Sequence, residues 1–229
     1  MTYPCRRIFA LLLTILTSAV IGCGGGGSNS IDYAALGASD VTGVGAVPIT
    51  NGYVYLIEDG IQQETNRGVA LENLGIPGAQ IGAIQSVEVE ILKRSGQPNV
   101  ITLSTGANDL IAGDSIDGFE RKLGEILSDL RSISPNAILA VSNLPDLTQL
   151  ERFRERPDRD VTLARVQGYN RAIARQVAGA RALLVDLYSV PLNDSLVSDV
   201  DGFHPSNAGH RAIANAFLAV IDPFLAGLE

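Results

Sequence analysis

Both histidines of the chain lie in one short stretch, DGFHPSNAGH (201–210). Asp201 precedes His204 by three residues, and Gly202 between them allows a tight turn, so the carboxylate can approach one imidazole nitrogen. That contact fixes the tautomer and orientation of the ring and leaves the other nitrogen free as a general base. The pair therefore predicts acid–base chemistry at His204. His210 falls one turn inside the following helix, and we interpret it as a packing or surface residue.

A base of this kind acts on a nucleophile, and Ser39 is the candidate hydroxyl. It lies in LGASDVTGVGA (36–46), directly after an apolar run. A strand-to-helix turn there can present the hydroxyl with its backbone N–H pointing inward. Ser39 also fits an ordinary helix N-cap. Gly43 and Gly45 suggest a dinucleotide loop as a further alternative, but that fingerprint requires glycine where this chain has Pro48.

Two further stretches follow apolar runs and carry hydrogen-bond donors. NLGIPGAQ (73–80) contains Gly75, whose N–H is not obstructed by a side chain. STGANDL (104–110) contains Asn108, whose side-chain amide can donate. Taken singly, each stretch is equally typical of a plain turn.

Five short apolar runs must position these groups. Their nearly continuous apolar character is typical of strands covered on both faces, as in a parallel sheet. The runs are DYAALG (32–37), GVALENL (68–74), NVITLS (99–104), AILAVSN (137–143) and ALLVDL (182–187).

Amphipathic stretches separate the runs, and three of them predict helices. One starts near Ile116, where Asp114 can cap it, and stops before Pro135; the others span about 161–177 and 207–221. The alternation predicts a single three-layer α/β/α domain with a parallel, five-stranded, flavodoxin-like sheet. Binding sites in such sheets form at the carboxyl ends of the strands. Three of the four stretches above follow the first three runs, and DGFHPSNAGH precedes the last helix.

The N-terminus predicts export. Residues 1–22 are typical of a secretory signal peptide, because two arginines precede fifteen mostly apolar residues, a run too short for a confident membrane span. VIGC (20–23) resembles the lipobox of bacterial lipoproteins, in which Cys23 becomes the lipid-bearing N-terminus; an ordinary signal peptide with an incidental cysteine is the alternative. Residues 23–30 form a glycine- and serine-rich tether. We expect an exported lipoprotein at the outer membrane, on its periplasmic side, or at the cell surface.

The composition limits the classes of partner that the protein is expected to bind. Cleavage before Cys23 leaves 15 basic and 25 acidic residues, a net charge of about −10, which argues against nucleic acid and against tight docking on anionic lipid. Residues 31–229 are enough for one domain, contain no cysteine and must hold together without a disulfide. Asp201, His204 and a distant His210 are too few ligands for a metal site. We expect a monomer.

Taken together, the four stretches resemble the SGNH (GDSL-type) hydrolase superfamily, whose four sequence blocks carry Ser, Gly, Asn and His. ALGASDVTGVGA is similar to the first block, NLGIPGAQI to the second, STGANDL to the third and DGFHPSNAGH to the last, and they occur in order between Asp32 and about Val220. One departure is that the aspartate usual before the serine is Ala38 here.

The resemblance implies a serine esterase or lipase that uses no cofactor or metal. Ser39 would attack an ester carbonyl, His204 would accept its proton, and Asp201 would orient His204. The oxyanion would be bound by the N–H groups of Ser39 and Gly75 and by the Asn108 amide.

The substrate is less defined. The resemblance implies small ester or acyl-ester substrates in general, and a carbohydrate O-acetyl esterase is the alternative to a general lipolytic enzyme. A non-catalytic envelope-binding lipoprotein on the same fold is an alternative of another class. ERFRERPDRD (151–160), with four basic and four acidic residues, is either a solvated loop or a lid over the pocket.

Overall fold

The computed structural model describes residues 30–228, so the predicted signal peptide and Cys23 lie outside the described residues. Every neighbouring pair of strands is parallel, and the sheet order is β2-β1-β3-β4-β5. This confirms the predicted five-stranded, flavodoxin-like sheet. The strands are β1 (Ile31–Gly37), β2 (Val69–Asn73), β3 (Val100–Ser104), β4 (Ile138–Ser142) and β5 (Leu183–Val185).

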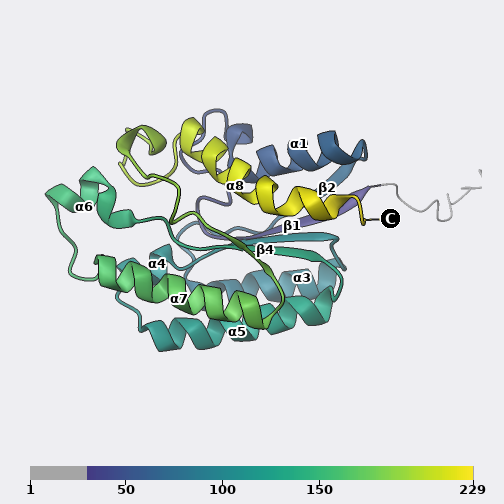
Figure 1. Cartoon of the computed structure of the whole chain (residues 1–229), viewed down its shortest axis with the longest axis horizontal. Helices are drawn as coiled ribbons and strands as arrows, with labels where there is room; N and C mark the ends of the chain where they lie inside the picture. The colour runs from purple at the N-terminus through teal and green to yellow at the C-terminus, as the bar shows by residue number, and fades with distance from the viewer. Residues whose placement is uncertain (1–29, 229) are drawn as a thin grey trace, which may run out of the picture.

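Helices cover both faces of the sheet, which gives three layers (Figure 1). One face packs against α1 (Tyr53–Thr65) and α8 (Asn207–Leu225). The other packs against α3 (Val89–Ser95), α5 (Ile116–Ile133) and α7 (Leu163–Gly179). From Tyr33 to Gly37, successive residues of β1 point to opposite layers and are all buried, which is why this part of the strand is continuously apolar.

Short helical segments lie in the connections. They are η1 (Ile49–Asn51), α2 (Ile81–Ala83), the π-helix η2 (Ile84–Glu88), α4 (Ala107–Ile111), η3 (Leu147–Gln149), α6 (Glu151–Glu155) and η4 (Asp194–Leu196).

The predicted cap of α5 is wrong by one residue. The Ser115 side chain, not that of Asp114, accepts the N–H of Gly118. The Asp114 carbonyl instead accepts hydrogen bonds from Tyr169 and Arg165 of α7. A serine and an aspartate side by side offer the same capping chemistry, and packing of α7 against α5 decides between them.

Other boundaries also differ from expectation. Helix α7 begins at Leu163 because Thr162 caps it, and α8 continues to Leu225. Helix α1 was not predicted, although Tyr53, Ile57 and Ile61 recur every fourth residue on its buried face. Within residues 30–228, none of the helices combines the length and hydropathy that crossing a lipid bilayer requires.

Candidate active site

The chemistry-bearing residues gather at the carboxyl ends of the central strands. Ser39 follows β1, Asn108 lies in α4 directly after β3, and His204 precedes α8. The chain runs from β1 to β2 at the sheet edge and then crosses to β3 on the other side of β1. This reversal in strand order opens the crevice in which doubly wound folds bind ligands.

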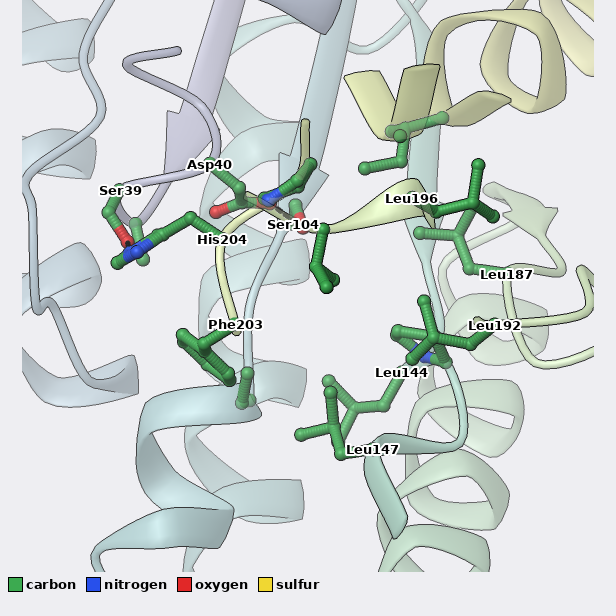
Figure 2. A pocket seen from close by; sticks show the side chains of 18 of the residues that line it. Ser39, Asp40, Ser104, Leu144, Leu147, Leu187, Leu192, Leu196, Phe203 and His204 are labelled. Atoms are coloured by element: carbon green, nitrogen blue, oxygen red, sulfur yellow. Dashed lines mark hydrogen bonds between the residues drawn. The ribbon is translucent and has the colours of Figure 1, made fainter. Parts of the chain in front are cut away.

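Three side chains form a continuous hydrogen-bonded series. Ser39 Oγ lies 2.8 Å from His204 Nε2, a contact drawn in Figure 2, and His204 Nδ1 lies 2.5 Å from Asp201 Oδ2. With its proton on Nδ1, the ring donates to Asp201 and accepts from the Ser39 hydroxyl. The other Asp201 oxygen accepts the N–H groups of Phe203 at 2.9 Å and His204 at 3.0 Å, so the carboxylate is itself fixed.

The environment keeps Asp201 ionised. Burial by itself would raise the pKa of Asp201, but the hydrogen bond with His204 and the two backbone N–H donors outweigh it and lower the pKa below its ordinary value. An ionised carboxylate at this position stabilises a positive charge that forms on the imidazole.

The predicted oxyanion donors are not equally available. Within residues 30–228, the Ser39 N–H donates to no protein acceptor. Asn108 uses one amide hydrogen on the Ala79 carbonyl at 2.9 Å and retains the second. The Gly75 N–H, however, donates to Asn73 Oδ1 at 3.1 Å. The N–H of Gly78, in the same loop, has no such partner among the described residues.

One pocket lies in this crevice beside Ser39 and His204, and it brings together only some of the predicted residues. Ser39, Asn108 and His204 line it, and Asp201 supports His204 from outside. Neither Gly75 nor Gly78 lines the pocket.

Close packing holds the Ser39 loop in place. Gly37 has φ of +141°, and a Cβ there would lie 2.1 Å from the Ser104 carbonyl, so only glycine lets β1 and β3 approach at this point. The Gly37 N–H donates to Glu88 Oε2 at 2.7 Å. Ser104 Oγ donates to Asp40 Oδ2 at 2.8 Å. Burial raises the pKa of Asp40, and this hydrogen bond opposes the rise.

Sequence reasoning missed these supporting residues. Asp40 stands directly after Ser39, whereas the family's usual aspartate position is Ala38. Glu88 is fully buried, and the sequence carries no signal for this because Glu90, two residues later in the same VEVE pattern, is a surface acid.

The sequence left His210 as a packing or a surface residue, and in the structure it is fully buried and packs in the core. Its Nδ1 accepts the N–H of Tyr53 at 3.2 Å, and its Nε2 donates to the Val44 carbonyl at 3.0 Å. Burial lowers the pKa of His210, so the ring is neutral at neutral pH, in agreement with one accepting and one donating nitrogen. His210 therefore ties the end of the Ser39 loop to the start of α1.

The charged stretch 151–160 is partly helical and supports the pocket rim. Phe153 of α6 is buried and packs edge-on against Phe203 with ring centroids 6.2 Å apart. The Arg152 guanidinium lies 5.3 Å from the centroid of the Phe203 ring. Phe203 lines the pocket beside His204. Within residues 30–228, no group of three or more His, Cys, Asp or Glu side chains is arranged to hold a metal ion.

Comparison with known proteins identifies the family of the chain. A sequence profile of the GDSL-like Lipase/Acylhydrolase family matches residues 35–212. No curated protein matches the chain in sequence.

Several solved structures share the fold. The lipase Lip_vut3 from a goat rumen metagenome has a TM-score of 0.69 and 21% identity, over 83% of this chain and 97% of that one. The Clostridium thermocellum family 3 carbohydrate esterase has a TM-score of 0.68 and 20% identity, over 87% and 98%. The psychrotrophic esterase EstA from Pseudoalteromonas sp. has a TM-score of 0.67 and 17% identity, over 85% and 98%.

Proposed function

The chain belongs to the GDSL-like Lipase/Acylhydrolase family and is an ester hydrolase, and we propose that it cleaves carboxylic esters through a triad of Ser39, His204 and Asp201. The observation that carries the proposal is the pair of contacts on one imidazole: 2.8 Å from Nε2 to the serine hydroxyl and 2.5 Å from Nδ1 to the carboxylate. A nucleophile, a base and a group that orients the base are the three parts that acyl transfer requires.

The reaction proceeds in two halves. Ser39 Oγ attacks the ester carbonyl carbon while His204 Nε2 takes its proton, and Asp201 stabilises the resulting imidazolium. His204 then gives that proton to the leaving alcohol as the carbon–oxygen bond breaks, which leaves an acyl group on Ser39. A water molecule, deprotonated by His204, attacks this acyl-enzyme. His204 then returns the proton to Ser39 Oγ as the acyl carbon–oxygen bond breaks, which releases the carboxylic acid and free Ser39.

The tetrahedral oxyanion takes hydrogen bonds from the Ser39 N–H, the second amide hydrogen of Asn108 and a glycine N–H of the loop after β2. Gly75 serves this role only after its N–H leaves Asn73 Oδ1, whereas the N–H of Gly78 has no protein partner to leave among the described residues. Donors fixed in advance by the fold stabilise the oxyanion without reorganisation during the reaction.

The test is kcat on a short-chain p-nitrophenyl ester. Ser39→Ala and His204→Ala should each lower kcat by about 10⁴-fold or more, and the double variant should be no slower than either single one, because the two residues act as a unit. Asp201→Ala should cost less, since the ring loses orientation and keeps its basic nitrogen. Ser132→Ala, on the exposed side of α5, is the matched control. A His204→Ala enzyme with near-normal kcat would exclude the triad.

We also propose that the enzyme is anchored through a lipid on Cys23, on the strength of the VIGC sequence alone. Mass spectrometry of the membrane fraction should find a diacylglyceryl Cys23 as the N-terminus. An unmodified N-terminus elsewhere, in a soluble fraction, would show that the stretch is an ordinary signal peptide.

A further inference from the structure

The pocket extends well beyond the reacting groups, over the carboxyl ends of β4 and β5. There it is lined by side chains of one kind, which come from the segments after those two strands. They are Leu144, Leu147, Leu187, Val190, Leu192 and Leu196. In Figure 2, Leu187, Leu192 and Leu196 lie across the pocket from the Ser39–His204 pair.

This apolar end offers almost nothing to a polar ligand. Among residues 30–228, the ionisable side chains that line the pocket are His204 and Asp40, and Asp40 already accepts a hydrogen bond from Ser104. The side-chain amide of Asn143 donates to Asp186 Oδ1 at 2.7 Å, and Asn143 Oδ1 accepts the Tyr188 N–H at 2.9 Å. The hydroxyls of a sugar would leave water here without partners, which is costly, whereas an alkyl chain gains from the same transfer.

We propose that the apolar end of the pocket binds the acyl chain of the substrate, and that the enzyme prefers esters of medium-chain fatty acids, of about six to ten carbons. The inference rests on the proposed triad, because the acyl carbonyl must sit at Ser39. At a spacing of about 4.8 Å between neighbouring strands, the three steps from β1 to β5 cover about 14 Å, the length of an extended acyl chain of about ten carbons.

The position of His204 assigns this end to the acyl chain rather than to the alcohol. The leaving oxygen takes its proton from His204, so the alcohol must lie on the His204 side of the tetrahedral carbon. The side chains of His204 and Asp201 are 23% and 34% exposed, so that side opens to solvent. After the alcohol departs, the acyl group stays on Ser39, and the apolar end is where its chain remains buried.

Leu192 is the residue that we infer limits chain length. It lies in the segment between β5 and η4, is only partly buried, and lines the pocket on the side away from Ser39. A larger ring at this position fills the space that the end of the chain would occupy and leaves the reacting groups untouched. Leu163→Phe, an exposed position at the start of α7 outside the pocket, is a matched control for the same substitution.

The experiment varies the two halves of the ester separately. One series keeps p-nitrophenol as the alcohol and lengthens the acyl chain from acetate to palmitate. The other keeps acetate and lengthens the alcohol from ethyl to octyl. kcat/KM is measured for both series below the concentration at which the esters aggregate, with wild type, Leu192→Phe, Leu192→Ala and Leu163→Phe.

In wild type, kcat/KM should rise about two- to fourfold for each added acyl methylene up to eight or ten carbons, and then level off. The alcohol series should stay flat within a few-fold. Leu192→Phe should lower the octanoate-to-acetate ratio at least tenfold with acetate nearly unchanged. Leu192→Ala should move the optimum to longer chains, and Leu163→Phe should change neither series.

Other results overturn the inference in distinct ways. An enzyme that is fastest on acetate throughout the acyl series takes an acetyl group, which favours the carbohydrate O-acetyl esterase. A rise in the alcohol series instead would place the chain on the leaving group. If the octanoate-to-acetate ratio of kcat/KM were unchanged in Leu192→Phe, the acyl chain would bind elsewhere than at Leu192. Hydrolysis in wild type that persists in Ser39→Ala would instead refute the proposed triad.

Discussion

Replacement of Glu88 by glutamine should stabilise the protein, by an amount that grows with pH. Glu88 is fully buried beneath the Ser39 loop, where one oxygen accepts the Gly37 N–H at 2.7 Å and the other has no partner among the described residues. Burial raises the pKa of Glu88 to about 8; the Gly37 hydrogen bond opposes the rise and the nearby charge of Asp40 adds to it. The folded protein therefore holds a proton on Glu88 at neutral pH.

The magnitude follows from proton linkage. Glu88 titrates near its ordinary pKa of 4.5 in the unfolded chain and near 8 in the folded one, so between these values the folded state binds the extra proton. Stability must then fall as pH rises through that window, at about 1.4 kcal/mol per pH unit and on the order of 5 kcal/mol in total. Glutamine keeps the volume and an acceptor oxygen for Gly37 and does not titrate.

The assay is urea unfolding of wild type and Glu88→Gln at three pH values. The free energy of unfolding of the variant should exceed that of wild type by less than 1 kcal/mol at about pH 5, by about 3 kcal/mol at pH 7 and by about 5 kcal/mol at pH 8.5. Glu90→Gln, a surface carboxylate paired with Lys93, is the control and should show no such increase. A difference between Glu88→Gln and wild type that is the same at every pH would refute the reasoning.

Three further predictions concern single side chains. Asn108→Leu should lower kcat by about 10²- to 10³-fold through loss of an oxyanion donor, and a kcat within a few-fold of wild type would assign that role elsewhere. His210→Ala should cost about 1 to 3 kcal/mol in urea unfolding, because the Tyr53 N–H loses its buried acceptor. Burial lowers the pKa of His210, so its contribution to stability is present above about pH 6.5 and is lost as pH falls, and the alanine variant should lack that loss. Ser115→Ala should cost about 1 kcal/mol by removing the cap of α5, whereas Asp114→Ala should cost less; equal costs would contradict the assigned cap.

The sequence predicted those features of the structure that depend on residues close together in the chain. The five apolar runs predicted the five strands because strands covered on both faces are apolar at most consecutive positions, as in β3 and β4, where nearly every residue is buried. Asp201 and His204 are three residues apart, so the turn that joins them was also legible from the sequence. The order of the four stretches placed Ser39 and Asn108 just after strands and His204 just before the last helix, and parallel strands bring their carboxyl ends to one edge of the sheet.

Tertiary structure decided what depends on contacts between distant segments. Ser39 and His204 are 165 residues apart, and only the strand order and the packing of α8 set their 2.8 Å contact. Glu88 looks like a surface acid until η2 packs under Gly37, where burial and one hydrogen bond fix its protonation.

The surroundings of Gly75 and the leucines of the pocket also depend on the folded structure. Gly75 stays the donor predicted from its sequence block; here its N–H donates to Asn73 Oδ1, and the Asn73 side chain in turn donates to the Val41 carbonyl, 32 residues away. The apolar residues between 144 and 196 look like scattered loop leucines in the sequence, and they form one surface only because the segments after β4 and β5 meet above the sheet. A run of apolar residues that are neighbours in the chain is visible in the sequence. An apolar cavity wall built from separate loops becomes visible only when those loops fold onto the same strand ends.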